Sequence, residues 1–193
     1  MKVRSALTGE NVLYLDVETQ RTALECGGFT RAAMRRRGLA VAVTWRKAQG
    51  GYRIYREHDC RQLIADLRAS EFVVGFNCRN FDYQVIHGHV RFRTPRTLDL
   101  LDVVAKARGF RIGLDALAQG TFGRARPSNG TDNVANWQDG KRSAVERACR
   151  RDVLLIRRLH EHMIDTGWVA YLDSLGDRHE FKVPAKVLGS CIR

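Results

Sequence analysis

Two carboxylates stand two residues apart in an apolar stretch near the start of the chain. This stretch, residues 11–19, is rich in Val and Leu and predicts a β-strand. Because successive side chains of a strand point to opposite faces, Asp16 and Glu18 share one face, about 7 Å apart. Two acids on one face repel each other unless a cation lies between them. This spacing could bind a divalent metal ion, although a strand end running into a solvated turn is the simpler structural alternative.

Two further carboxylates occupy unusual positions. Asp82 falls in the first turn of a helix predicted over residues 81–90, directly after a buried apolar strand at 72–76. Asp152 lies on the apolar stripe of a long helix predicted over residues 143–166, where a carboxylate needs a cation or hydrogen-bond donors. Hard divalent cations take oxygen ligands, and two ions about 4 Å apart can stabilise both oxygens of a phosphodiester displacement. Together the four acids favour metal-assisted phosphodiester hydrolysis over coincidence.

The elements that must position these acids form an α/β pattern. Residues 39–56 read as a β-hairpin that extends the first strand into a three-stranded antiparallel meander. The apolar strand at 72–76 is typical of parallel pairing. We therefore predict a mixed sheet, an antiparallel meander plus parallel strands, with helices on both faces. The other predicted elements are helices near 30–37, 59–67, 97–109 and 113–118, a long loop at 119–142, and a terminal hairpin from strands at 168–172 and 179–183.

The charge of the chain indicates a polyanionic partner. Its 193 residues include 33 Lys and Arg against 21 Asp and Glu, a formal net charge of +12. Such a balance is typical of nucleic-acid-binding proteins, although most of the cations are Arg, which a GC-rich genome would also favour. Arginines within residues 31–37, 91–96 and 124–126 would follow the nucleic-acid backbone.

Composition also argues against several classes of protein. No apolar run approaches the roughly 20 residues of a membrane span, and we see no signal peptide. The five cysteines are odd in number and lack Cys-x-x-Cys spacing, so a disulfide framework or zinc site is not expected. We expect a cytoplasmic protein in a reducing compartment. His87 and His89, like His160 and His162, lack the spacing of a helical metal pair.

Three segments together resemble the motifs of a known superfamily. The segment Leu15-Asp16-Val17-Glu18-Thr19 is similar to the first motif of the DEDD exonucleases, which have the ribonuclease H-like fold. Val74-Gly75-Phe76-Asn77 followed by Phe81-Asp82 resembles the second motif, and Cys149-Arg150-Arg151-Asp152-Val153 resembles the third. The resemblance spans roughly residues 11–165. Within the superfamily the chain is most similar to bacterial predicted 3′–5′ exonucleases found beside helicase domains, with support from residues 97–101, 114–118 and 121–123.

The resemblance implies a function and a set of roles. Asp16 would bridge two Mg²⁺ or Mn²⁺ ions, with Glu18, Asp82 and Asp152 completing the site. Asn77 and Phe81 would lie near the terminal nucleotide, although Phe81 could equally be a core aromatic residue. The substrate would be single-stranded DNA or RNA, and a helicase or repair-machinery protein would be a partner. Residues 1–166 would form the ribonuclease H-like exonuclease domain, and residues 167–193 a hairpin-like extension packed on it.

One position departs from the superfamily. Its members usually carry a Tyr four residues before the last Asp or a His five residues before it, where this chain has Ala148 and Arg147. Neither can act as a general base. Tyr83, His87 and His89 are the remaining local candidates. The departure leaves open a catalytically weak or inactive nucleic-acid-binding module of the same fold, and an endonuclease is a third interpretation. Asp99 and Asp102 are interpreted as helix-start residues, not as ligands.

Overall fold

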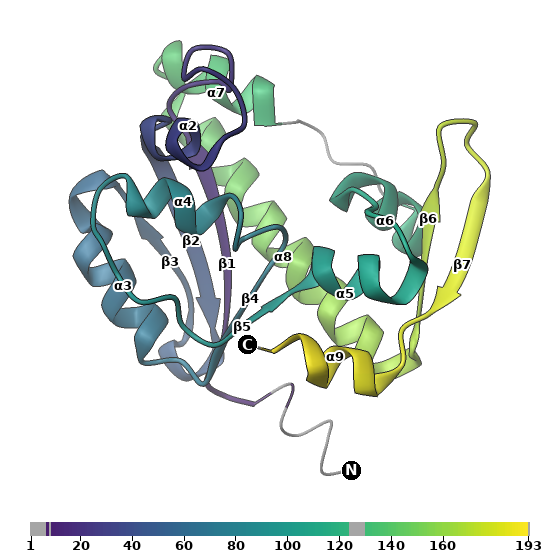
Figure 1. The fold of residues 1–193 in the computed structure, drawn as a ribbon. Coiled ribbons are helices and arrows are strands. Elements are labelled where there is room, and N and C mark those ends of the chain that lie inside the picture. The colour runs from purple at the N-terminus through teal and green to yellow at the C-terminus, as the bar shows by residue number, and fades with distance from the viewer. Residues whose placement is uncertain (1–6, 8, 124–129, 193) are drawn as a thin grey trace.

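A five-stranded mixed sheet places β1 (Val12–Thr19) at its centre (Figure 1). The computed structural model describes Leu7, residues 9–123 and residues 130–192. The strand order is β3-β2-β1-β4-β5, with β2 at Leu39–Arg46, β3 at Gly51–Tyr55, β4 at Phe72–Gly75 and β5 at Thr97–Asp99. The first three strands pair antiparallel, whereas β4 runs parallel to β1 and β5 parallel to β4. The predicted meander and parallel strands are therefore confirmed.

Helices cover both faces of this sheet, as predicted (Figure 1). Val12 and Tyr14 of β1 belong to one core cluster, together with the apolar stripe of α8 (Arg142–Thr166). Leu13 and Leu15 point the other way, into a second cluster with α3 (Cys60–Arg68) and α4 (Asp82–His87). The alternation along β1 thus gives the strand two buried faces, and the carboxylates of Asp16 and Glu18 are on the α8 side.

The segment predicted as a long loop at 119–142 contains helical structure, so that prediction was wrong. α6 extends over Leu114–Phe122, and α7 covers Gly130–Gln138. Residues 124–129 lie outside the described part of the chain. α7 is short and polar, but Val134 is buried and Trp137 packs against the core, three residues apart on one side of the helix. α7 consequently packs on α8 and on β1.

The remaining helices lie near their predicted positions, but residues 97–99 form β5 and not the start of a helix, and α4 ends at His87 and not at residue 90. α2 covers Arg31–Arg36 and is capped by the Thr30 side chain, which accepts a hydrogen bond from the amide of Ala33. α5 covers Leu100–Arg108 and ends at Gly109, whose positive φ suits a glycine. Two short 3₁₀ turns, η1 (Lys47–Gln49) and η2 (Glu57–Asp59), flank β3.

The C-terminal extension is a hairpin followed by a helix that was not predicted. β6 (Trp168–Leu172) and β7 (Arg178–Lys182) pair antiparallel, as expected. α9 (Ala185–Cys191) then packs against α5, and Ile192 forms a β-bridge with Leu98 of β5. The hairpin-like description of residues 167–193 is therefore incomplete, because this tail also covers the β5 edge of the sheet.

Two expectations from composition can be examined directly. None of the described helices is both long and apolar enough to cross a membrane. All five cysteines are buried free thiols, which agrees with the prediction that they form no disulfide framework. Cys149 contributes to the site region, because its thiol donates to the backbone carbonyl of Asp16 across 3.3 Å.

Candidate metal centre

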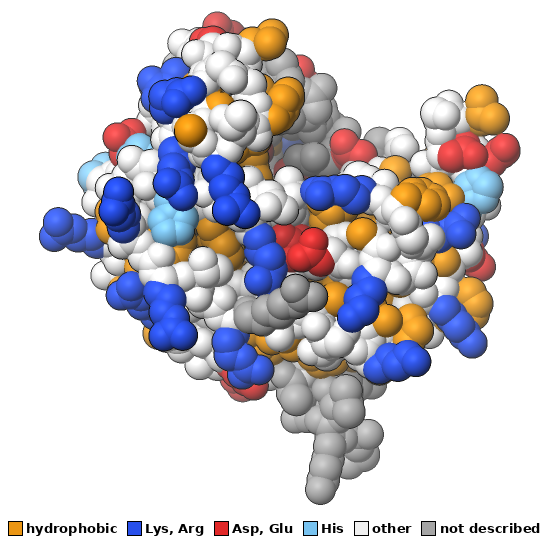
Figure 2. Space-filling model, viewed as in Figure 1, with side chains coloured by type: hydrophobic (Ala, Val, Ile, Leu, Met, Phe, Trp, Pro, Cys, Tyr) orange, Lys and Arg blue, Asp and Glu red, His pale blue; other side chains and the backbone are white. Residues whose placement is uncertain are grey.

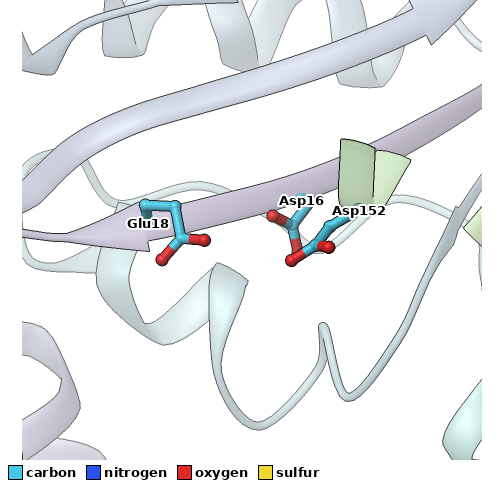
Figure 3. A group of neighbouring side chains, drawn as sticks. All are labelled: Asp16, Glu18 and Asp152. Carbon is cyan, nitrogen blue, oxygen red and sulfur yellow. The ribbon is translucent and has the colours of Figure 1, made fainter. Parts of the chain in front are cut away.

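Three of the four predicted acids meet where β1 lies against α8 (Figure 3). Asp16 and Glu18 project from β1, and Asp152 approaches them from α8. One carboxylate oxygen from each lies within 4.8 Å of the other two. Glu18 and Asp152 are buried, whereas Asp16 is half-buried. The strand alternation and the helical stripe that the sequence indicated therefore bring residues from distant parts of the chain to one point.

Asp82 is the fourth predicted acid, and it is the most deeply buried of the set. It lies in the first turn of α4 and is only 2% exposed. Burial raises the pKa of the Asp82 carboxyl well above its ordinary value, and the charge of Asp16 raises this pKa further. The carboxyl is not part of the three-acid group defined by the 4.8 Å separation. Asp82 therefore interacts with the centre through its charge, and it lies outside the closest group.

Two cavities open beside the acids and share Asp16 as a wall. The first has a volume of about 340 Å³ and is lined by all three clustered acids and by Phe81. The second, of about 440 Å³, contains Asn77 and Arg111 in its wall. Phe81 and Asn77, the two predicted substrate contacts, thus lie in cavities on either side of Asp16. Their role toward a nucleotide remains a prediction.

The second cavity is held in shape by Asp99. Its carboxylate accepts hydrogen bonds from the backbone amides of Asn77 at 2.7 Å and Arg79 at 3.2 Å, and it caps α5 by accepting from Leu101. These bonds fix Asn77 in a left-handed conformation with φ of 61°, which Asn tolerates better than most residues. The interpretation of Asp99 as a helix-start residue is confirmed. The burial of Asp99 raises its pKa.

Asn133 of α7 is a site residue that sequence reasoning missed. Its Nδ2 donates a 2.6 Å hydrogen bond to Oε1 of Glu18, and the Asn133 side chain is 1% exposed. A buried carboxylate needs such a donor, and this one holds one oxygen of Glu18 in place. The segment around Asn133 lacks a strong apolar pattern, so its sequence offered no signal for this contact.

None of the proposed substitutes for the missing base lies at the acids. Ala148 is buried on α8 and Arg147 is exposed. Tyr83 forms a buried hydrogen bond with Thr97, His87 stacks on Phe92, and the ring of His89 accepts a hydrogen bond from the amide of Leu39. Among the described residues, the walls of the two cavities include no Tyr or His. The suggestion that Tyr83, His87 or His89 supplies a base is therefore not supported by their positions.

Lys and Arg side chains are spread over one face of the molecule. Figure 2 shows them across this face, with a small acidic patch near its centre. Of the predicted arginine groups, residues 31–37 include α2 beside the first cavity, and residues 91–96 follow α4. The third group, residues 124–126, lies outside the described residues.

Comparison with known proteins adds no relative to this picture. No protein-family model matches the chain, and no curated protein matches it. The chemistry of the centre must therefore be judged from its donors. Three carboxylates within reach of one ion offer only oxygen ligands. Hard cations such as Mg²⁺ and Mn²⁺ prefer an all-oxygen ligand set, whereas zinc favours nitrogen and sulfur ligands.

Proposed function

We propose that the protein is a metal-dependent nuclease, a 3′–5′ exonuclease that hydrolyses phosphodiester bonds of single-stranded DNA or RNA. The observation that carries this proposal is the meeting of Asp16, Glu18 and Asp152 within 4.8 Å in a protein of net charge +12. A domain that only bound a polyanion would gain nothing from clustered negative charge at its binding face. Divalent ions reconcile the acids with a phosphate substrate.

The proposal includes membership of the DEDD superfamily and the ribonuclease H-like fold. Support comes from the strand order β3-β2-β1-β4-β5, with its antiparallel meander and two parallel strands. Further support comes from the placement of the three motifs, on β1, at the start of α4 and on α8. The direction of digestion and a helicase or repair-machinery partner follow from the resemblance alone and are part of the proposal.

The residues of the chain have distinct roles in this proposal. Asp16, Glu18 and Asp152 would hold the metal, and Asp82 would contribute to the same centre after losing its proton. When bound, two Mg²⁺ or Mn²⁺ ions would activate water and neutralise charge developing on the phosphodiester oxygens. Asn133 keeps Glu18 oriented, and Phe81 and Asn77 would contact the nucleotide on either side of Asp16. The basic surface would draw in the substrate.

Nucleotide release from a 5′-labelled single-stranded oligonucleotide tests the proposal directly. We expect stepwise shortening that requires Mg²⁺ or Mn²⁺ and stops with a chelator. Asp16→Asn and Asp152→Asn should each lower the rate by more than about 100-fold. Mutation of a residue that only hydrogen-bonds to a metal ligand already lowers activity about 10- to 100-fold, and loss of a ligand itself should cost more.

The matched control is Asp139→Asn. Asp139 is exposed and pairs with Lys141 on the surface, so its loss should leave the rate unchanged. Unchanged digestion by both Asp16→Asn and Asp152→Asn would refute the assignment of the centre. Digestion of an end-blocked oligonucleotide would point to endonuclease action in place of exonuclease action.

One observation favours a second candidate, a nucleic-acid-binding module that cuts weakly or not at all. A methyl group, Ala148, stands where the resembling enzymes carry a catalytic Tyr, and neither cavity supplies a Tyr or His from its described lining. Loss of a general base typically costs about 10²–10⁴-fold in rate. If the wild-type protein binds a single-stranded oligonucleotide without metal and does not hydrolyse it even at high protein concentration, the binding module is the correct interpretation.

A further inference from the structure

A buried arginine lines the first cavity together with the acids. Arg37 follows α2, lines the same cavity as Asp16, Glu18 and Asp152, and is only 8% exposed. Its guanidinium carbon lies 5.4 Å from the ring centroid of Phe81 and 5.8 Å from that of Phe29. Cation–π contacts with the two rings thus hold the cation at the cavity wall.

The hydrogen-bonding capacity of Arg37 is incompletely used. Its Nε is buried and has no hydrogen-bond partner among the described residues. Leaving a donor of a buried cation unsatisfied is costly, and the phenyl rings offer no oxygen acceptor. Burial also lowers the pKa of this guanidinium, although an arginine stays charged at any physiological pH. The unsatisfied donor indicates a group whose hydrogen bonding a ligand oxygen would complete.

The two rings around Arg37 differ in exposure. Phe81 is half-buried and also packs against the second core cluster, the one between the sheet and helices α3 and α4. Phe29 is 79% exposed while lining the cavity, an unusual position for a large apolar side chain. An exposed phenyl ring beside a cation is the arrangement that stacks a nucleobase next to a bound phosphate. The lining of the cavity therefore combines acidic side chains that could hold a metal with one cation and two aromatic rings.

We propose that Arg37 binds a phosphate oxygen of the nucleotide adjoining the acid cluster and that Phe29 stacks on its base. This inference rests on the proposed nuclease function and names the part of the cavity that recognises the substrate. Arginine suits this role because its planar fork of donors matches phosphate oxygens. The site would then recognise a nucleoside monophosphate unit by its phosphate and by the flat face of any base.

Ligand titrations separate the phosphate contact from the base contact. The probes are adenosine 5′-monophosphate and adenosine, each titrated calorimetrically in the presence of Ca²⁺. We expect Arg37→Ala to lower the affinity for the monophosphate at least tenfold and to change the affinity for adenosine less than twofold. Arg37→Lys should retain part of the monophosphate affinity. Phe29→Ala should weaken both ligands by a similar factor, since each carries the same base.

Arg68→Ala is the matched control, because Arg68 is an exposed arginine at the end of α3 and lines neither cavity. It should bind both ligands as wild type does, and thermal melting should show that every variant is folded. The phosphate assignment is overturned if Arg37→Ala lowers the affinity for both ligands equally or changes neither affinity. It is also overturned if the wild-type protein does not bind the monophosphate.

Mn²⁺ titration and oligonucleotide digestion provide the independent readout of the proposed function. Arg37→Ala should bind Mn²⁺ with wild-type affinity, since Arg37 is not one of the acidic ligands. If the wild-type protein binds Mn²⁺ and digests the oligonucleotide, but the monophosphate titrations give one of the contradicting results, only the Arg37 inference is wrong. If Mn²⁺ fails to bind wild-type protein, the proposed function itself is wrong.

Discussion

At the scale of single residues, the carboxyl of Asp82 is in electrostatic conflict with its surroundings. Its carboxyl is buried beside Asp16, and both burial and the neighbouring charge raise its pKa. In an unfolded chain the same group ionises near pH 4. The folded protein therefore binds this proton more tightly, so the stability it contributes is complete below about pH 4 and is lost as pH rises toward the folded-state pKa.

The first prediction follows from this linkage. In a chelating buffer near neutral pH, Asp82→Asn should melt at a higher temperature than wild type, because a neutral amide replaces a carboxyl that resists ionisation. The difference should shrink as the pH is lowered toward about 4, where the wild-type carboxyl is protonated in both states. Thermal denaturation across this pH range measures it. A variant less stable than wild type at every pH would contradict the argument.

The second prediction concerns Asn133, whose amide donates to Glu18. Asn133→Ala should lower the free energy of unfolding by about 1–3 kcal/mol, because it removes one hydrogen bond to a buried carboxylate. It should also weaken Mn²⁺ binding, since Glu18 loses its fixed orientation. Urea denaturation and Mn²⁺ titration measure these effects. Asn136→Ala, on the same helix but only half-buried, serves as the control and should change neither quantity.

The sequence indicated the acids together with Asn77 and Phe81, but it offered no signal for Asn133 or for the position of Arg37. Asp16 and Glu18 could be found because a two-residue spacing on an apolar strand fixes their common face. Arg37 lies within an arginine-rich segment, and nothing local distinguishes it from Arg35 or Arg36. Its role depends on Phe81, which precedes α4 in the sequence and contacts Arg37 only in the folded protein. Such a contact is a property of tertiary structure.

At the scale of elements, the sequence predicted those with strong periodicity and missed those without it. β1 alternates between two apolar faces, and α8 keeps an apolar stripe over 25 residues, so both appeared where expected. α7 has few apolar residues and becomes helical while packed on α8 and β1. α9 is shorter still, and it is supported by its contacts with α5 and β5. Tertiary packing stabilises short helices that propensity alone leaves marginal.

The third prediction concerns the contact that positions α2 beside the cavity. Gly88 ends α4, and a Cβ atom added there would lie 2.0 Å from the carbonyl oxygen of Arg35 in α2. Gly88→Ala should therefore separate the two helices and lower the free energy of unfolding by about 1–3 kcal/mol, the usual cost of overpacking. Urea denaturation measures this change.

Gly189→Ala is the control for this prediction. A Cβ atom at Gly189 of α9 would meet nothing within 4 Å, so alanine should be neutral or stabilise the helix by up to about 1 kcal/mol. If Gly88→Ala were as stable as Gly189→Ala, the close approach of α2 and α4 would not be a constraint on the fold.

At the scale of the whole molecule, the net charge of +12 sets the expected response to salt. The fourth prediction is that binding of a single-stranded oligonucleotide, measured by fluorescence anisotropy in a chelator, weakens steeply with salt. A protein that contacts six or more phosphates of a single strand loses about 300-fold or more in affinity between 50 and 200 mM salt. A loss below about threefold would contradict a binding mode dominated by phosphate contacts.

The acids of the centre come from β1 and from α8, elements near opposite ends of the chain. During synthesis, a nascent polypeptide carries Asp16 and Glu18 long before Asp152 has left the ribosome. The hydrolytic centre proposed here is therefore incomplete until α8 has been made and has docked on the sheet. An incompletely translated or proteolytically shortened chain that lacks α8 would be harmless to the nucleic acids around it.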